Sequence, residues 1–221
     1  MKLSRVFIVN LLLVIGMFAL SIWAWLQLPP DAQIATRFGL DGSPTAYMGK
    51  IAGLLFSPLM ALSFVFTYPI LPKIEPKRKN LKRSRKAYDI FSIALLVFFG
   101  ISHGAIVFFA LGKTIDVPTI IIVALGAFLI VLGNYYSKIR RNYSFGVRTP
   151  WTLDSDLAWH KTHRWAGWLT VLHGVGLMAA GMRSHTILPV VVLISFVVVS
   201  VVILPICSYL WWREDANRFL E

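Results

Sequence analysis

The sequence predicts an all-α polytopic membrane protein with six transmembrane helices and both termini in the cytoplasm. Hydrophobic residues make up 57% of the 221 residues and charged residues 14%, whereas about 25% of a soluble domain is charged. Six stretches of 18 to 26 residues contain no Asp, Glu, Lys or Arg, and about 20 apolar residues cross a bilayer as a helix. These stretches are residues 6–28, 51–72, 90–112, 117–137, 165–182 and 187–212.

The distribution of basic residues predicts the orientation. Of the 22 Lys and Arg residues, 18 lie in the termini and alternate connections that would share one side of the membrane, and 4 lie in the other connections. Positive charge collects on the cytoplasmic side of membrane proteins. The formal net charge of +12 is therefore mainly topological, and we do not expect nucleic acid as a partner.

The first stretch is interpreted as a retained helix rather than a cleaved signal peptide. It is longer than a signal-peptide core, and Trp23 and Trp25 lie where cleavage would need small side chains. The single cysteine, Cys207, allows neither an internal disulfide nor a cysteine-based metal site within one chain.

The connections differ in character. Residues 29–50 form a long external loop with Pro-Pro, Asp-Gly and Ser-Pro steps, which are typical of turns and predict irregular ordered structure. Residues 73–88 form a basic cytoplasmic loop, which anionic lipid headgroups would attract; an acidic protein partner is the alternative. The short external connections near 113–116 and 183–186 predict antiparallel helix pairs.

The second cytoplasmic connection, residues 138–164, is the polar exception in a hydrophobic chain. Pro150 disfavours helix at Thr149, and Gly146 permits an unusual backbone angle. A helix capped by Thr152, Asp154 or Ser155 is expected to follow. Its tryptophans and basic residues suit a helix that emerges through the headgroup layer into the fifth span.

Two histidines, His103 and His173, fall near the middle of their predicted spans. Neutral, hydrogen-bonded bundle histidines are the simpler interpretation, and a haem or metal site is the alternative. The spans lack ionisable Asp, Glu, Lys and Arg, which disfavours an ion-coupled transporter but leaves a facilitator for neutral solutes open. No catalytic motif is present, so we expect neither enzyme activity nor a bound cofactor or metal.

Arg148 is the candidate functional residue of the polar segment. Its guanidinium could tie the loop to carbonyls at a helix end, stack on Trp151, or bind an acidic partner. We favour a structural clamp, with Asn134, Asn142 and Tyr143 joining the same polar cluster.

Residues 133–168, GNYYSKIRRNYSFGVRTPWTLDSDLAWHKTHRWAGW, closely resemble the signature of the SdpI family, which are bacterial membrane proteins named for immunity to a secreted killing-factor peptide. The upstream segment, LPPDAQIATRFGLDGSPTAYMGK, resembles a domain often found before it, although Arg37 stands where a histidine is expected. The positions of the signature segment to which the resemblance draws attention are Asn134, Asn142, Tyr143, Gly146, Arg148, Thr149, Pro150, Trp151, Thr152, Trp159, His163 and Arg164.

The resemblance implies protection against a membrane-active toxin peptide at the bacterial cytoplasmic membrane and, in the founding member, signalling by holding a small cytoplasmic repressor at the membrane. It divides the chain into a two-span region, residues 1–88, and a four-span region, residues 89–221. It implies membrane lipid, a toxin peptide and a cytoplasmic repressor as partners. The residues of the external loop that would face a toxin are Asp31, Arg37, Phe38, Asp41, Gly42 and Pro44.

Overall fold

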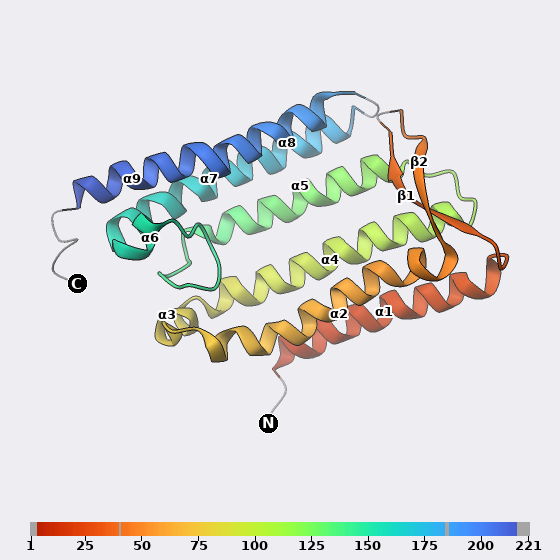
Figure 1. Ribbon diagram of the computed structural model, residues 1–221, viewed down its shortest axis with the longest axis horizontal. Coiled ribbons are helices and arrows are strands. Elements are labelled where there is room, and N and C mark those ends of the chain that lie inside the picture. Colours follow the sequence, from red (N-terminus) through yellow and green to blue (C-terminus); the bar gives the residue numbers. More distant parts are fainter. Residues whose placement is uncertain (1–3, 40, 184–185, 216–221) are drawn as a thin grey trace.

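A computed structural model describes residues 4–39, 41–183 and 186–215, and most of them lie in helices (Figure 1). The last helix is interrupted by a π-helical turn, Val199–Ile203, just before Pro205. The elements in chain order are α1 (Arg5–Gln27), β1 (Gln33–Phe38), β2 (Pro44–Gly49), α2 (Lys50–Ile74), α3 (Arg78–Arg83), α4 (Arg85–Ala110), α5 (Val117–Tyr136), α6 (Pro150–Asp154), α7 (Asp156–Gly181), α8 (Leu188–Val198) and α9 (Leu204–Glu214).

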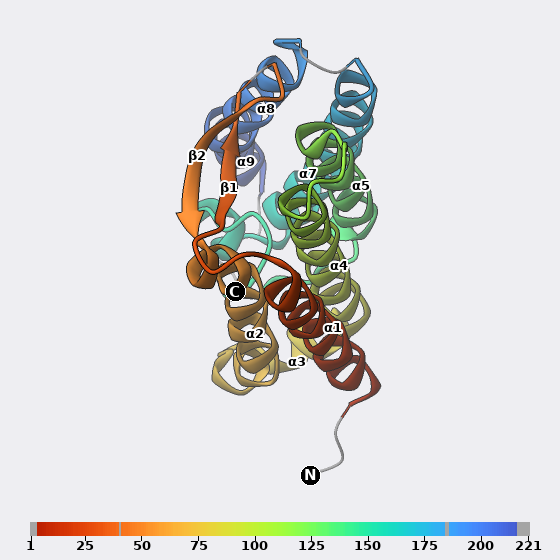
Figure 2. The same ribbon diagram turned by 90° about the vertical axis from the view of Figure 1, so that its right-hand side faces the viewer.

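The long helices pass back and forth along one direction and form an arc. Seen from the end that carries the two strands (Figure 2), the neighbours along the arc are α2, α1, α4, α5, α7 and the continuous α8–α9 helix. The helices α1, α2, α4, α5 and α8–α9 are long and apolar enough to cross a membrane. Helix α7 is 26 residues long but begins with polar and charged residues. The prediction of a membrane protein is therefore confirmed, whereas the six-span count and the orientation stay predictions.

The prediction of an all-α chain with an irregular loop at 29–50 was wrong for Gln33–Gly49, which form an antiparallel β-hairpin. Its turn lies at the Asp-Gly step, where Gly42 has φ of 79°. The two strands are bulged rather than regular. The buried side chain of Ile34 attaches the hairpin to the bundle by packing with Ala24, Leu54 and Val107.

Helices α5 and α7 approach each other more closely than any helix pair with larger residues could. A Cβ atom added to Gly126 or Gly174 would lie 2.6 Å from the backbone oxygen of the other residue. Gly133 and Gly167 oppose each other in the same way, at 2.7 and 2.8 Å. Small residues commonly allow such contact between membrane helices. This pair of helices therefore holds in place the polar segment that connects α5 to α7.

Candidate functional site

The segment 138–164, here called the signature loop, lies at the end of the bundle opposite the β-hairpin (Figure 1). It runs from the end of α5 through α6 into α7. At this end α3 and the last turn of α9 also contribute side chains. The loop therefore contacts two parts of the chain that are distant in sequence, α3 and the end of α9.

Asn142 organises the start of the loop. Its side chain is fully buried. The Oδ1 atom accepts from the backbone N–H groups of Ser144 and Phe145, each at 2.8 Å, and Nδ2 donates to the carbonyl of Arg140 at 2.8 Å. An Asn side chain commonly replaces backbone partners in a turn in this way. Asn142 therefore sets the direction in which the chain turns, and this turn places Phe145 at the end of the helical bundle.

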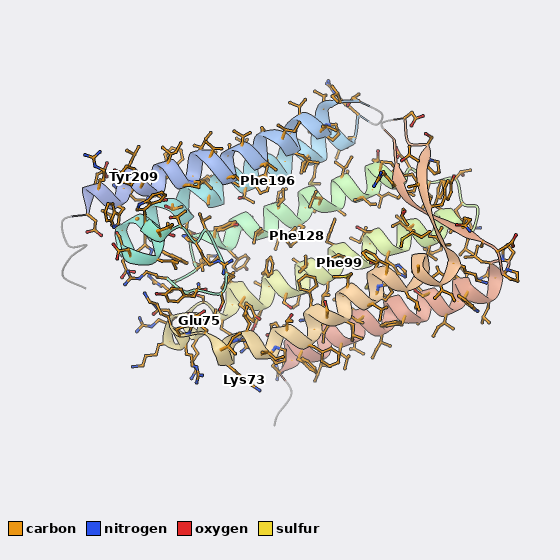
Figure 3. The ribbon with its side chains drawn as sticks, viewed as in Figure 1. Lys73, Glu75, Phe99, Phe128, Phe196 and Tyr209 are labelled. Atoms are coloured by element: carbon orange, nitrogen blue, oxygen red, sulfur yellow. The ribbon has the colours of Figure 1, made fainter. Side chains whose placement is uncertain are left out.

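Glu75, at the end of α2, binds the same turn from outside and was missed by the sequence reasoning. Only 2% of the residue is exposed. Its carboxylate accepts from the backbone N–H of Tyr143 at 3.1 Å and from that of Lys77 at 2.9 Å, and it also accepts from the hydroxyl of Ser144. Figure 3 labels it beside the loop. A buried carboxylate is tolerated only with such partners. The one acidic residue within the basic loop was the available signal.

The basic loop makes two more hydrogen bonds with the signature loop. Asn80 donates from Nδ2 to the carbonyl of Arg141 at 2.9 Å, and the Ser84 hydroxyl accepts from the backbone N–H of Arg140 at 2.8 Å. With Glu75, these contacts join residues 75–84 to residues 140–144. The basic loop is consequently part of the site rather than a separate charged linker.

His163 and Gly146 form the second part of the loop. The Nδ1–H of His163 donates to the carbonyl of Trp159 at 2.9 Å, so Nε2 is free to accept from the backbone N–H of Val147 at 3.1 Å. Gly146 has φ of 110°, and a Cβ there would lie 2.5 Å from Nε2 of His163. Burial lowers the pKa of His163 to about 4. The site thus requires a glycine and a neutral imidazole at these two positions.

Trp159 packs against the imidazole ring of His163. The residue is fully buried, its ring stacks on that of His163 with centroids 4.0 Å apart, and Nε1 donates to the carbonyl of Ile139 at 2.7 Å. This bond joins the first turns of α7 to the start of the signature loop.

Helix caps stabilise the middle of the loop. Thr149 caps α6 in a reciprocal arrangement with Thr152, and Pro150 occupies the first turn. The Thr149 hydroxyl is also 2.9 Å from that of Ser208 in α9. Ser155 caps α7 by accepting from the N–H of Ala158 at 3.0 Å. Of the three predicted helix caps, Ser155 fills that role for α7, while Thr152 belongs to the α6 cap.

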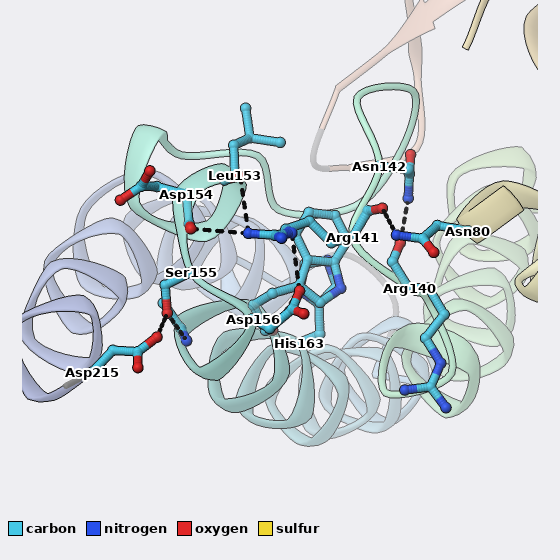
Figure 4. A network of polar contacts seen from close by, with 12 residues as sticks. Asn80, Arg140, Arg141, Asn142, Leu153, Asp154, Ser155, Asp156, His163 and Asp215 are labelled. Carbon is cyan, nitrogen blue, oxygen red and sulfur yellow. Dashed lines mark hydrogen bonds and ion pairs between the residues drawn. The ribbon is translucent and has the colours of Figure 1, made fainter. Parts of the chain in front are cut away.

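Arg141, which the sequence reasoning did not select, joins the loop to α7. Its guanidinium forms an ion pair with Asp156 at 2.9 Å and donates to the backbone carbonyl of Asp154 at 2.9 Å (Figure 4). The Asp154 carboxylate accepts from Nε1 of Trp212 at 2.6 Å. In this way Arg141, Asp154 and Trp212 connect the loop with the end of α9.

Arg148 lies on the exposed side of the loop. Its guanidinium donates to the carbonyl of Tyr143 at 2.6 Å, which is a contact within the loop rather than with a helix end. Trp151 packs against Tyr209 of α9 with ring centroids 5.3 Å apart. Among the residues that the structure describes, Arg148 therefore makes one hydrogen bond, and it remains exposed.

Two of the proposed site residues lie outside this network. Asn134 is exposed and donates to the carbonyl of Ile130 in its own helix at 2.9 Å, so it does not join the polar cluster as expected. Arg164 is also exposed and lies about two turns into α7. Both face the outer surface of the α5–α7 pair.

The residues expected to face a toxin lie in and beside the hairpin. Asp31, Arg37 and Asp41 are exposed, and the Asp41 carboxylate accepts from the backbone N–H of Ser43 at 3.1 Å. Phe38 instead packs edge-on against Phe109 of α4, with centroids 5.4 Å apart. Gly42 and Pro44 shape the turn and the start of β2. The hairpin thus exposes charged residues and uses Phe38 as an anchor.

The two bundle histidines do not meet. His103 is buried with Nε2 2.9 Å from the Ser21 hydroxyl, which itself donates to the carbonyl of Leu54 at 2.8 Å. His173 donates from Nδ1 to the carbonyl of Leu169 in its own helix at 2.6 Å. Among the described residues, no group of three or more His, Cys, Asp or Glu residues is placed to hold a metal ion.

These features define the class of protein: a multi-pass helical membrane protein with a packed polar loop at one end and a β-hairpin at the other. Residues 138–209 match the SdpI/YfhL protein family, and residues 12–62 match DUF1648, a domain of unknown function. These matches confirm the resemblance to the SdpI family. The chain is 24% identical over 209 residues to the immunity protein SdpI of Bacillus subtilis (strain 168), covering 94% of this chain and 96% of that protein. No solved structure matches.

Proposed function

We propose that this protein protects a bacterial cell against a secreted, membrane-active toxin peptide and has no enzyme activity. The observation that carries the proposal is the match to an immunity protein over nearly the whole length of both chains. The presence of both domains in one chain supports it, since the match includes the hairpin segment as well as the signature loop.

We place the protein in the bacterial cytoplasmic membrane with the signature loop inside and the hairpin outside. The basic residues of the loop end support this orientation because positive charge is retained in the cytoplasm. A toxin that arrives from outside would then meet the hairpin first. Arg37, Asp31 and Asp41 are exposed charged groups in and beside the hairpin that such a toxin could contact.

We also propose that the signature loop is the contact surface for a cytoplasmic protein such as a repressor. Buried hydrogen bonds fix its backbone, so it presents a rigid surface, and a rigid surface loses little conformational entropy on binding. Arg148 is exposed at this surface, and a guanidinium is well suited to bind the carboxylates of an acidic partner.

The test is survival of a sensitive bacterium challenged with a killing-factor-type peptide. The cells would produce the wild type, Arg37→Ala, Arg148→Ala, Arg83→Ala or no protein, with membrane abundance measured in each case. Arg83 is an exposed residue of α3 at the same end as Arg148, which makes it the matched control. We expect protection by the wild type and Arg83→Ala, and its loss in Arg37→Ala at normal abundance.

Each outcome has a distinct meaning. Wild-type protein that is abundant but gives no protection would refute the immunity proposal. Protection that survives Arg37→Ala would refute the role of the hairpin charge. Arg148→Ala tests the second activity: capture of a cytoplasmic partner should fall while abundance stays normal, because within the described part of the chain Arg148 makes a single, exposed hydrogen bond.

A further inference from the structure

We propose that the outer surface of the α5–α7 pair contains a binding site for the phosphate of an anionic phospholipid. The site is a hollow of about 280 Å³ beside the crossing point of the two helices. Its lining residues include Gly133, Asn134, Ser137, Arg164, Gly167 and Trp168. Nothing in the toxin or partner functions proposed above uses this surface.

The close contact of the two helices creates the hollow. Gly133 and Gly167 oppose each other so closely that an added Cβ would lie 2.7 to 2.8 Å from the opposite backbone oxygen. Neither position can therefore carry a side chain that would fill the groove, and the floor consists of backbone. Val171, one turn further along α7, continues the lining as an apolar surface.

Arg164 supplies the charge at the rim. It makes no hydrogen bond or ion pair with any residue in the described parts of the chain. Lys161, the next basic residue on the same side of α7, is instead paired with Glu214 at 2.7 Å. Arg164 thus remains the available cation, and its planar guanidinium can bind two phosphate oxygens at once.

The other groups at the rim match the remaining parts of a phospholipid. Ser137 offers an exposed hydroxyl as a second donor. Trp168 is 71% exposed, and its amphipathic ring is of the kind that lies at the level of lipid headgroups. A second hollow shares Arg164 and Trp168 with the first and is also lined by Lys161, Trp165 and Trp211. A headgroup at Arg164 would therefore have the apolar rings of these tryptophans nearby for its acyl chains.

Charge identifies an anionic lipid as the occupant. This end of the protein is strongly basic, and anionic lipids of the inner leaflet are attracted to such surfaces. The zwitterionic headgroup of phosphatidylcholine carries the same phosphate together with a cation, which Arg164 would repel. A specific site should distinguish the two lipids even when their chains are identical.

The experiment is native mass spectrometry of the full-length protein in detergent, titrated with phosphatidylglycerol or phosphatidylcholine of identical acyl chains. We expect one phosphatidylglycerol molecule to bind at least about tenfold more tightly than phosphatidylcholine, in line with a charge-assisted hydrogen bond. Arg164→Gln should abolish that preference, and Ser137→Ala should reduce it. Arg83→Gln, which makes the same charge change at an exposed site on α3, should retain it.

Three results would overturn the proposal. The first is equal affinity for the two lipids in the wild type. The second is a preference that Arg164→Gln and Arg83→Gln change equally, since only general charge would then matter. The third is displacement of the lipid by millimolar inorganic phosphate, which would identify a site for the free anion rather than for a lipid. Thermal unfolding of each variant shows whether the fold is intact, so that loss of binding can be assigned to the site.

Discussion

The glycine contact between α5 and α7 allows a sharp test of how the bundle is held together. In Gly174→Ala, the added Cβ would lie 2.6 Å from the carbonyl oxygen of Gly126 and 2.9 Å from the backbone nitrogen of Ile130. Both atoms belong to the backbone of α5, so no side-chain rotation can relieve the overlap. Ordinary contact begins at 3.4 Å, and the helices would therefore have to part by about 0.8 Å at this point.

The cost follows from that separation. A radial gap of about 0.5–1 Å loses a quarter to a half of the dispersion attraction of each contact along the seam. Overpacking of this kind destabilises proteins by about 1–3 kcal/mol. Alanine is intrinsically better than glycine within a helix by up to about 1 kcal/mol, which partly offsets the loss. We expect a net destabilisation of about 1–2 kcal/mol.

Thermal unfolding of the purified protein in a mild detergent measures the effect. Gly176→Ala is the matched control because it lies in the same helix, and its added Cβ would be 3.5 Å from Val192, an ordinary contact. The control should unfold at the wild-type temperature or slightly above it. Equal unfolding temperatures for Gly174→Ala and Gly176→Ala would refute the close approach of the two helices.

Three further predictions concern the signature loop and its anchors. Glu75→Ala should lower the free energy of unfolding by about 1–3 kcal/mol, because it removes the buried carboxylate that accepts from the backbone N–H groups of Tyr143 and Lys77. Glu214→Gln, which alters an exposed ion pair, should change it little, and equal effects in urea titration would contradict the role of Glu75. Burial lowers the pKa of His163 to about 4 from an ordinary 6.5, so the stability that the neutral imidazole provides should be complete above about pH 6.5 and lost as the pH falls toward 4. His163→Gln should remove this component of the pH dependence of stability, and an unchanged pH profile in the variant would contradict the prediction. Gly146→Ala should fail to form the loop, since it combines φ of 110° with a Cβ 2.5 Å from His163, whereas Gly16→Ala, with open space around it, should accumulate normally in membrane blots.

The sequence was sufficient to locate most of the architecture. Long uncharged stretches specify membrane helices because the bilayer imposes one length and one polarity on them. The non-helical start of the signature loop followed from Gly146 and Pro150, whose backbone constraints are local. The hairpin was missed because Gln33–Phe38 and Pro44–Gly49 are short strands with bulges, and only Ile34 and Ala35 of β1 are buried.

The tertiary contacts of the site were much harder to predict from the sequence. Glu75 is separated from Tyr143 by 68 residues, and no periodicity or spacing connects them. Arg141 appeared to be one of several interfacial basic residues until its ion pair with Asp156 was seen. The glycines were a usable signal, since Gly126 and Gly133 are spaced by seven residues, as are Gly167 and Gly174, and this spacing places them on one face of each helix.

Within the signature loop, buried residues determine the shape of the loop, and exposed residues are available to bind a partner. Asn142, Thr152, Trp159 and His163 are buried, and each satisfies a backbone or side-chain partner within the bundle. These residues determine a fold of the loop and cannot contact a partner without unfolding it. Arg148 is exposed, and its substitution should therefore alter binding while the loop stays formed. The resemblance to the SdpI family thus predicts a common loop structure more strongly than a common partner, and selectivity is expected to come from exposed residues around Arg148 and on the hairpin.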